Sequence, residues 1–319
     1  MTIARVDTHH HIVPPVWARA LRETGYFGGQ AVPDWSAELA LDVMDQLSVA
    51  TAITSVGRPG VFVKGDPGRT ARLARAVNEF SADLARKHPG RFGFFASLPL
   101  PGVDDALAEV EHAFDVLGAD GVILLTNVNG TYVGDPAWDP VMAELDRRGA
   151  VVFIHPTAPE GLPPVPGVPP FVVDFLLDTT RALVQLVRLG TLDRHSHLKV
   201  IASHAGGFLP YAAGRVAGLV EDADGRAMDR ERVIATLRTM WFDTALSSAR
   251  FTLPSLLELA SPDRILFGSD WPYARGNHVH FTRELDESPL TPDLRSAINH
   301  GNAAALFPAR LSGAKSSTG

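Results

Sequence analysis

Short apolar and β-branched runs alternate along the chain with longer stretches of a different pattern. Several of the short runs are continuously apolar, as in VVFI at 151–154, which is typical of strands buried on both faces in a parallel sheet. We expect eight strands, at residues 4–12, 49–56, 92–100, 119–126, 150–157, 198–206, 240–246 and 264–272.

The longer stretches predict helices, because their apolar residues recur every three or four positions. In 103–117, for example, Leu107, Val110 and Phe114 fall on one stripe. Another helix is expected to begin at Ser36, a residue type that caps helix N-termini. The clearest helices are predicted at 66–87, 103–117, 136–148, 171–189 and 253–260.

Eight strands alternating with helices predict an α/β fold, a single (β/α)₈ TIM barrel with long loops at its C-terminal face. The barrel would occupy residues 1–311, and the small polar residues 312–319 would form a flexible tail. A doubly wound open sheet would instead need a glycine-rich turn after the first strand, where the sequence has VPP at 13–15. The connections 25–35 and 158–170, rich in Gly and Pro, predict either lids or surface insertions.

Composition narrows the classes of partner and metal site. The net charge is -7 and the basic residues are scattered, so no nucleic-acid partner is expected. No apolar run approaches the roughly 20 residues that cross a bilayer, so no membrane span is expected. The N-terminus lacks an apolar signal core, which favours a cytoplasmic location. With no cysteine in the chain, any transition metal would be bound through His, Asp or Glu.

Polar residues with metal-binding chemistry end four of the predicted strands. His9 and His11 lie two positions apart, so on a strand they project from one face while the residue between them points away. His155, His204 and Asp270 each end a buried apolar run. Taken alone, HHH at 9–11 could be a polar turn with incidental histidines. In a barrel, however, all five side chains would converge on the C-terminal mouth, where active sites of this fold lie.

The sequence resembles the amidohydrolase superfamily, specifically the branch that contains aminocarboxymuconate-semialdehyde decarboxylase and salicylate-type decarboxylases. The matching segments are VDTHHHIVPP, FIHP, ASHAGGFLPY, FGSDWPY and GNAAALF, which span nearly the whole chain in the same order. The resemblance implies a metal held by His9, His11, His155 and Asp270, with His204 as the catalytic acid or base.

Three imidazoles and one carboxylate suit Zn²⁺ best, with Mn²⁺ as the second choice. Binuclear members of the superfamily carry a bridging lysine at the end of the fourth strand. Here that strand ends in LLTN at 124–127, so we expect one divalent ion. No organic cofactor is expected, because the chain has no nucleotide-binding signature.

The resemblance also implies a homodimer. In the muconate-semialdehyde decarboxylase, an arginine in the position of Arg215 reaches from the neighbouring subunit to the substrate carboxylate. A plain helix arginine that pairs with Glu221 is the alternative for this residue. That enzyme also uses an arginine before its second strand, whereas residues 25–36 contain none here. This departure favours a substrate with one acid group over a dicarboxylate.

Other residues near the expected mouth are candidates for substrate contacts, and each has a purely structural alternative. Arg58 could face the mouth or lie in a surface turn, and Asn127 could contact substrate or cap a turn. Trp271 and Tyr273 could wall an aromatic pocket or simply pack. Asp243 is interpreted either as an acid that supports a metal-binding residue from behind or as a purely structural acid.

A second His-x-His pair, His278 and His280, has no flanking apolar strand. We interpret both residues as exposed loop positions, although a role in the pocket stays open.

The resulting functional prediction is non-oxidative decarboxylation of a small aromatic or enoic carboxylic acid. The metal would stabilise the charge that develops while His204 or Asp270 delivers or relays a proton to carbon. An alternative is metal-dependent hydrolysis of an amide, lactone or ester, in which Asp270 would accept a proton from water. A non-catalytic binding protein on the same barrel is a third possibility. The likeness to the decarboxylase branch favours the first.

Overall fold

The eight predicted strands are all present in the computed structural model, which describes residues 4–25, 31–273 and 276–312. Each is shorter than its apolar run, because the last residues of the run leave the ladder and enter the loops at the carboxyl end. The strands are β1 (Arg5–His11), β2 (Val49–Ser55), β3 (Phe92–Ser97), β4 (Gly121–Leu125), β7 (Val151–His155), β8 (Lys199–Ala202), β9 (Trp241–Asp243) and β10 (Ile265–Leu266).

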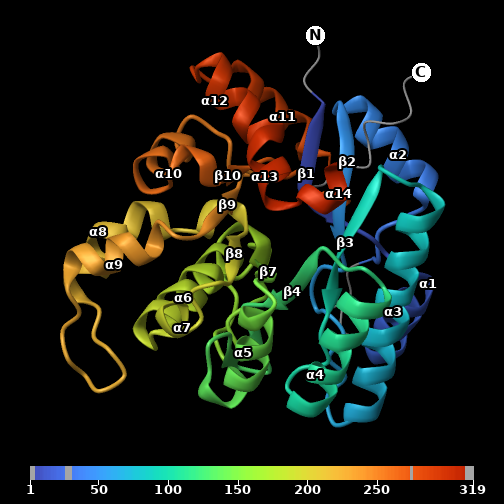
Figure 1. The fold of residues 1–319 in the computed structure, drawn as a ribbon, viewed down its shortest axis with the longest axis horizontal. Helices are drawn as coiled ribbons and strands as arrows, with labels where there is room; N and C mark the ends of the chain where they lie inside the picture. The colour runs from blue at the N-terminus through green and yellow to red at the C-terminus, as the bar shows by residue number, and fades with distance from the viewer. Residues whose placement is uncertain (1–3, 26–30, 274–275, 313–319) are drawn as a thin grey trace.

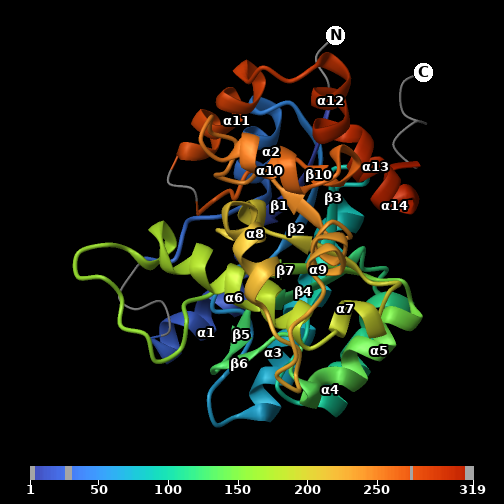
Figure 2. The same ribbon diagram turned by 90° about the vertical axis from the view of Figure 1, so that its left-hand side faces the viewer.

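These strands form one parallel sheet in the order of the chain, from β1 to β10. The sheet closes between its first and last strands. The backbone N–H of Thr8 donates to the carbonyl of Phe267 (3.0 Å), and that of His11 donates to Trp271 (2.7 Å). Helices surround the strands on the outside (Figures 1 and 2). The predicted TIM barrel is therefore confirmed.

Two apolar clusters hold the barrel together. The larger cluster lies between the strands and the surrounding helices. The smaller one fills the barrel interior, where Phe95 and Phe153 stack with ring centroids 5.2 Å apart. Phe307, which directly follows α13 (Asn302–Leu306), packs against Phe95 (5.9 Å). The interior is thus packed with side chains rather than forming an open pore.

The predicted helices are present with small differences at their ends. Ser36 caps α2 as expected by accepting from the N–H of Leu39 (3.2 Å). The helix expected from 171 begins at Asp174, because 170–172 form a 3₁₀ turn and Val173 leaves the helical region. The helices that follow these strands are α1 (Pro15–Thr24), α2 (Ala37–Gln46), α3 (Pro67–Lys87), α4 (Val103–Glu111), α5 (Asp139–Arg147), α6 (Asp174–Arg188), α7 (Thr191–Arg194), α8 (Leu209–Leu219), α9 (Arg230–Leu237) and α10 (Leu253–Leu259).

After β10 the chain forms helices that the sequence pattern did not predict: α11 (Asn277–Glu287), α12 (Pro292–Ser296), α13 and α14 (Pro308–Ser312). The interpretation of His278 and His280 as loop residues is therefore wrong. Both lie in the first turns of α11, whose Leu285 is buried in the core. His280 is exposed as expected, but His278 is half-buried.

The two long connections both reach the mouth of the barrel. The segment 158–170 is largely exposed, projects from the barrel (Figure 2) and leads into Phe171 at the rim. Of the connection 25–35, residues 26–30 lie outside the described residues, and Ala31 and Pro33 line the cavity at the mouth. The expected tail falls mostly outside the described residues, apart from Ser312 at the end of α14. Among the helices of the described chain, none combines the length and apolar character needed to cross a bilayer.

Candidate metal centre and active site

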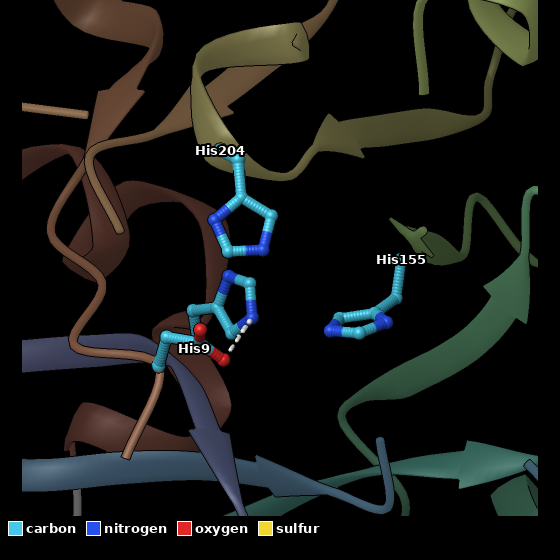
Figure 3. Close-up of side chains that lie close together, drawn as sticks. His9, His155 and His204 are labelled. Atoms are coloured by element: carbon cyan, nitrogen blue, oxygen red, sulfur yellow. Dashed lines mark ion pairs between the residues drawn. The ribbon is translucent and has the colours of Figure 1, made fainter. Parts of the chain in front are cut away.

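The five polar residues singled out at the strand ends lie together at the C-terminal mouth. Figure 3 shows three of them, His9, His155 and His204. His9 Nε2 lies 3.1 Å from His11 Nε2 and 3.3 Å from Asp270 Oδ1. His11 Nε2 lies 3.2 Å from the same Asp270 oxygen. Ligand atoms of His9, His155, His204 and Asp270 all lie within 4.8 Å of one another. One ion placed among these atoms could therefore bind several of them at once.

The outward hydrogen bonds of the histidines decide which ring nitrogen faces the centre. Nδ1 of His155 lies 2.9 Å from the carbonyl of Pro156, and Nδ1 of His204 lies 3.0 Å from that of Ala245. A carbonyl only accepts, so each Nδ1 carries the proton and each Nε2 presents a lone pair to the centre. Nδ1 of His11 likewise faces the carbonyl of Ser55 (3.3 Å).

His9 is oriented by a carboxylate instead of a carbonyl. Its Nδ1 lies 2.8 Å from Asp243 Oδ2, and both side chains are fully buried. A carboxylate behind a histidine fixes its tautomer and raises its basicity, an arrangement common around protein-bound metals. Of the two roles considered for Asp243 from the sequence, the structure therefore favours support of a metal-binding residue, because Asp243 orients His9 directly.

The electrostatics of the centre suit a cation. Burial lowers the pKa of His155 well below its ordinary value and also lowers those of His11 and His204. These imidazole rings are therefore neutral near pH 7, and each can give a lone pair to a metal ion. Burial disfavours a charged His9, but Asp243 and Asp270 outweigh it and raise the pKa of His9 to about 10. Without a metal, the two carboxylates thus hold a proton on His9, and a divalent ion would displace that proton.

Asp270 is a carboxylate in this environment. Burial works against its charge, but the neighbouring His11 and His9 rings prevail and hold its pKa well below the usual range. Neutral imidazoles combined with a carboxylate form the donor set expected for a mononuclear divalent site.

His204 and Asp270 both adopt left-handed backbone conformations, with φ of 52° and 58°. Such angles are uncommon for residues other than glycine and persist only where the surroundings enforce them. Asp243 Oδ1 accepts from the backbone N–H of His204 (2.9 Å) and of Ala245 (3.0 Å). The N–H of Asp270 donates to the carbonyl of His9 (2.8 Å). These contacts hold both side chains towards the centre.

A second buried carboxylate, Asp7, ties the first strand to the loop that carries Asp270. Its oxygens accept from the N–H groups of His9 (3.0 Å) and Ser269 (3.1 Å) and from the Ser269 hydroxyl (2.6 Å). It also faces His10 Nδ1 (3.0 Å). Sequence reasoning gave Asp7 and Ser269 no role, although their positions next to the two metal-binding motifs were a usable signal.

A cavity of about 700 Å³ opens above the centre and is lined at its base by His155, His204 and Asp270. Its walls are mostly apolar and come from the segments that follow the strands, especially the beginnings of α6, α8 and α10. Sequence reasoning considered polar strand ends and missed these walls, which include Phe171, Phe175, Leu176, Phe208, Leu246 and Phe251. The cavity suits a small molecule with an apolar body.

The structure places some of the candidate substrate-contact residues at the cavity and others away from it. Arg58 and Tyr273 line the cavity, and Arg58 does so from a partly exposed turn. Trp271 does not belong to the described lining. It packs on His10 with ring centroids 4.9 Å apart, because its side chain turns to the outer face of the first strand.

Asn127 lies away from the cavity lining and holds a turn together. Its Oδ1 accepts from the N–H of Gly130 (3.1 Å), and its Nδ2 donates to Asp178 (3.0 Å). The turn-capping alternative therefore describes it, and its amide is already satisfied. Arg215 is exposed on α8 and is absent from the described lining of its own cavity.

Comparison with known proteins places these features in a family. The sequence matches the amidohydrolase family over residues 6–309. It is 39% identical over 318 residues to the 6-methylsalicylic acid decarboxylase of Penicillium expansum, with 98% of each chain covered. The crystal structure of an amidohydrolase II superimposes with a TM-score of 0.88 at 32% identity, covering 96% of this chain and 100% of that one. A 2,6-dihydroxybenzoate decarboxylase in complex with 2,6-dihydroxybenzoate gives 0.78 at 25% identity, with 96% and 99% covered.

This chain therefore belongs to the amidohydrolase family. Within the family its relatives are decarboxylases, including a γ-resorcylate decarboxylase of Rhodococcus jostii at 28% identity. The predicted resemblance is confirmed, and with it the predicted reaction class, a carboxy-lyase. These relatives lend no support to the hydrolase or to the binding-protein alternative.

Proposed function

We propose that this protein removes the carboxyl group of a small hydroxybenzoate, with 6-methylsalicylate as the first candidate substrate, without an oxidant. The observation that carries the proposal is the convergence of four buried imidazoles and the Asp270 carboxylate at the floor of a largely apolar cavity. The ring of a hydroxybenzoate fits a cavity of about 700 Å³ with room for substituents. The 39% identical relative supports the choice of acid.

One divalent metal ion is part of this proposal, with Zn²⁺ ahead of Mn²⁺. His9, His11, His155 and Asp270 would hold it, because their donor atoms face a common point and the imidazoles present Nε2. Bound there, it would act as a Lewis acid towards the oxygens of the substrate. His204 also lies within this group and lines the cavity, and we assign it to proton transfer because the resemblance to the decarboxylase branch implies that role.

Decarboxylation replaces the carboxylate on a ring carbon with a proton, so the site needs a group that moves one. His204 is neutral near pH 7 and keeps its proton on Nδ1 through the bond to Ala245. Its Nε2 can therefore accept a proton from the substrate hydroxyl or from water and pass it to the ring carbon. The bond to CO₂ then breaks, and its electrons return to the ring. Asp270, a carboxylate beside His204, would relay or stabilise that proton.

The remaining assignments are also proposals. Tyr273 and Arg58 would contact substrate from the cavity wall. Arg215 would act on the cavity of a second subunit, since it is exposed on its own chain, and this requires a homodimer. A cytoplasmic location is consistent with the absence of cysteine.

The test is CO₂ release by metal-loaded protein from salicylate, 6-methylsalicylate and dihydroxybenzoates, with lactones, esters and amides as a parallel panel. We expect CO₂ from at least one hydroxybenzoate and about one metal ion per chain. His300→Ala changes an exposed histidine outside the site and serves as the matched control for variants of the site histidines. Hydrolysis of the second panel without CO₂ from the first would contradict the proposal.

A further inference from the structure

Arg58 lies on a hydrogen-bonded turn that packs against the candidate metal centre. The N–H of Gly60 donates to the carbonyl of Gly57 (2.9 Å), and the indole N–H of Trp17 donates to the carbonyl of Gly60 (2.7 Å). A Cβ on Gly57 would lie 3.0 Å from the Tyr273 ring and 3.5 Å from the His11 ring. The backbone therefore approaches the site closely, and the Arg58 side chain starts from a fixed point beside it.

The Arg58 side chain is half-buried and has no acidic partner in the described chain. Its Nε is inaccessible to solvent and lacks a hydrogen-bond partner among the described residues. Its Cζ lies 5.1 Å from the centroid of the Phe175 ring, another wall of the cavity. Burial lowers the pKa of Arg58, opposed in the described chain only by Tyr273, yet arginine stays charged near pH 7. A buried charge of this kind is costly unless an anion accompanies it.

The charges around the cavity indicate which anion that would be. Among the lining residues that the structure describes, Arg58 is the only Arg or Lys, and Asp270 is the only Asp or Glu. Asp270 already faces His9 and His11. Arg58 is therefore the charged side chain of the described lining that remains available to bind an anionic group on a ring.

We propose that Arg58 binds the carboxylate of an aromatic acid at this site. The proposal deepens the proposed function and rests on it for the identity of the reaction, but the binding claim stands on its own.

The position of the charge predicts how Arg58 affects catalysis. The carboxylate charge disappears as CO₂ leaves, so an interaction with it is at least as strong in the ground state as in the transition state. Such an interaction lowers KM without raising kcat. Replacing Arg58 should therefore raise KM for the acid much more than it lowers kcat.

The test compares benzoate with benzamide, a neutral molecule of nearly the same shape. Neither carries the hydroxyl expected for turnover, so binding to metal-loaded protein can be followed at equilibrium by NMR titration. We expect Arg58→Met to weaken benzoate binding about 10- to 100-fold, the usual strength of a charged hydrogen bond, and benzamide binding less than about 3-fold. Arg181→Met is the matched control, because Arg181 also lies over an aromatic ring (Tyr132, 5.3 Å) but away from the cavity lining.

Equal losses for both ligands, or no loss for either, would overturn the assignment. Should Arg58→Met fail to fold, Arg58→Lys decides, since it keeps the charge but loses the planar fork, and the benzoate preference should fall by several-fold. The two proposals fail separately. Absence of CO₂ release with an Arg58-dependent benzoate preference refutes only the reaction, and CO₂ release with an Arg58-independent preference refutes only this inference.

Discussion

Replacing Asp243 with asparagine tests how the protein prepares His9 for a metal. Asp243 is fully buried, with one oxygen 2.8 Å from His9 Nδ1 and the other accepting two backbone N–H groups. Asparagine keeps the shape, and its carbonyl oxygen can still accept from the N–H groups of His204 and Ala245. Its NH₂ group would then face His9 Nδ1, and a donor there requires a lone pair on that nitrogen. The ring proton would move to Nε2, the nitrogen that faces the metal centre.

The size of the effect follows from the pKa of His9. Burial opposes the charge on His9, yet Asp243 and Asp270 raise its pKa from 6.5 to about 10. This rise corresponds to about 5 kcal/mol in favour of positive charge at the ring. Asp243 makes the largest favourable contribution to this rise in pKa, and its negative charge would stabilise a bound metal ion in the same way. We expect Asp243→Asn to weaken metal binding about 10- to 100-fold, the usual effect of removing an outer partner of a metal-binding histidine.

The assay is competition for Zn²⁺ against a fluorescent chelator at pH 7.5, with folding checked by circular dichroism. Asp178→Asn is a matched control, because Asp178 is also a fully buried carboxylate with three side-chain donors, but it lies on α6 away from the centre. We expect the control to lower stability and leave metal affinity unchanged. Wild-type affinity in folded Asp243→Asn protein would refute the reasoning.

Three further outcomes are expected. His204→Ala should keep about one metal ion per chain by elemental analysis while losing turnover; loss of the metal would mean that His204 is a ligand. The raised pKa of His9 stabilises metal-free protein fully below pH 6.5, and this contribution is lost as pH rises through about 10. The urea midpoint of metal-free protein should therefore fall between pH 7 and 10, and that of metal-loaded protein should fall much less. Arg215→Ala should raise KM for acid substrates about 10-fold with normal metal content; an unchanged KM in a protein shown to be dimeric would discard the shared-site proposal.

The backbone around the centre suggests why these groups are held so firmly. His204 and Asp270 follow different strands, yet both adopt left-handed angles that place their side chains towards the same point. Buried carboxylates, Asp243 and Asp7, bind the N–H groups of the turns involved. Local strain of this kind is tolerated where surrounding contacts fix it, and it keeps the proton-moving groups oriented before substrate arrives.

The sequence by itself determined the barrel and the polar residues at its mouth. Continuous apolar runs mark strands buried on both faces, and polar residues at the ends of such runs must lie at one edge of a parallel sheet. His9, His11, His155, His204 and Asp270 were found in this way, since strand periodicity and strand ends are local properties. Helices α11 to α14 were missed, because their short apolar patterns are stabilised by contacts with the barrel rather than by their own periodicity.

Only the tertiary structure decided what surrounds those residues. The tautomers depend on carbonyls and carboxylates from distant strands, such as Asp243 behind His9. Arg58 differs from a surface arginine because it is half-buried at the cavity wall and has no acidic partner in the described chain. This depends on how the turn after β2 packs against Tyr273 and Phe175. Asn127 also follows a strand, but its amide donates to Asp178 on α6 instead of lining the cavity. Its position in the sequence could not predict this partner. Partners, burial and the resulting charge states are set by chain segments far apart in sequence, and only folding brings them together.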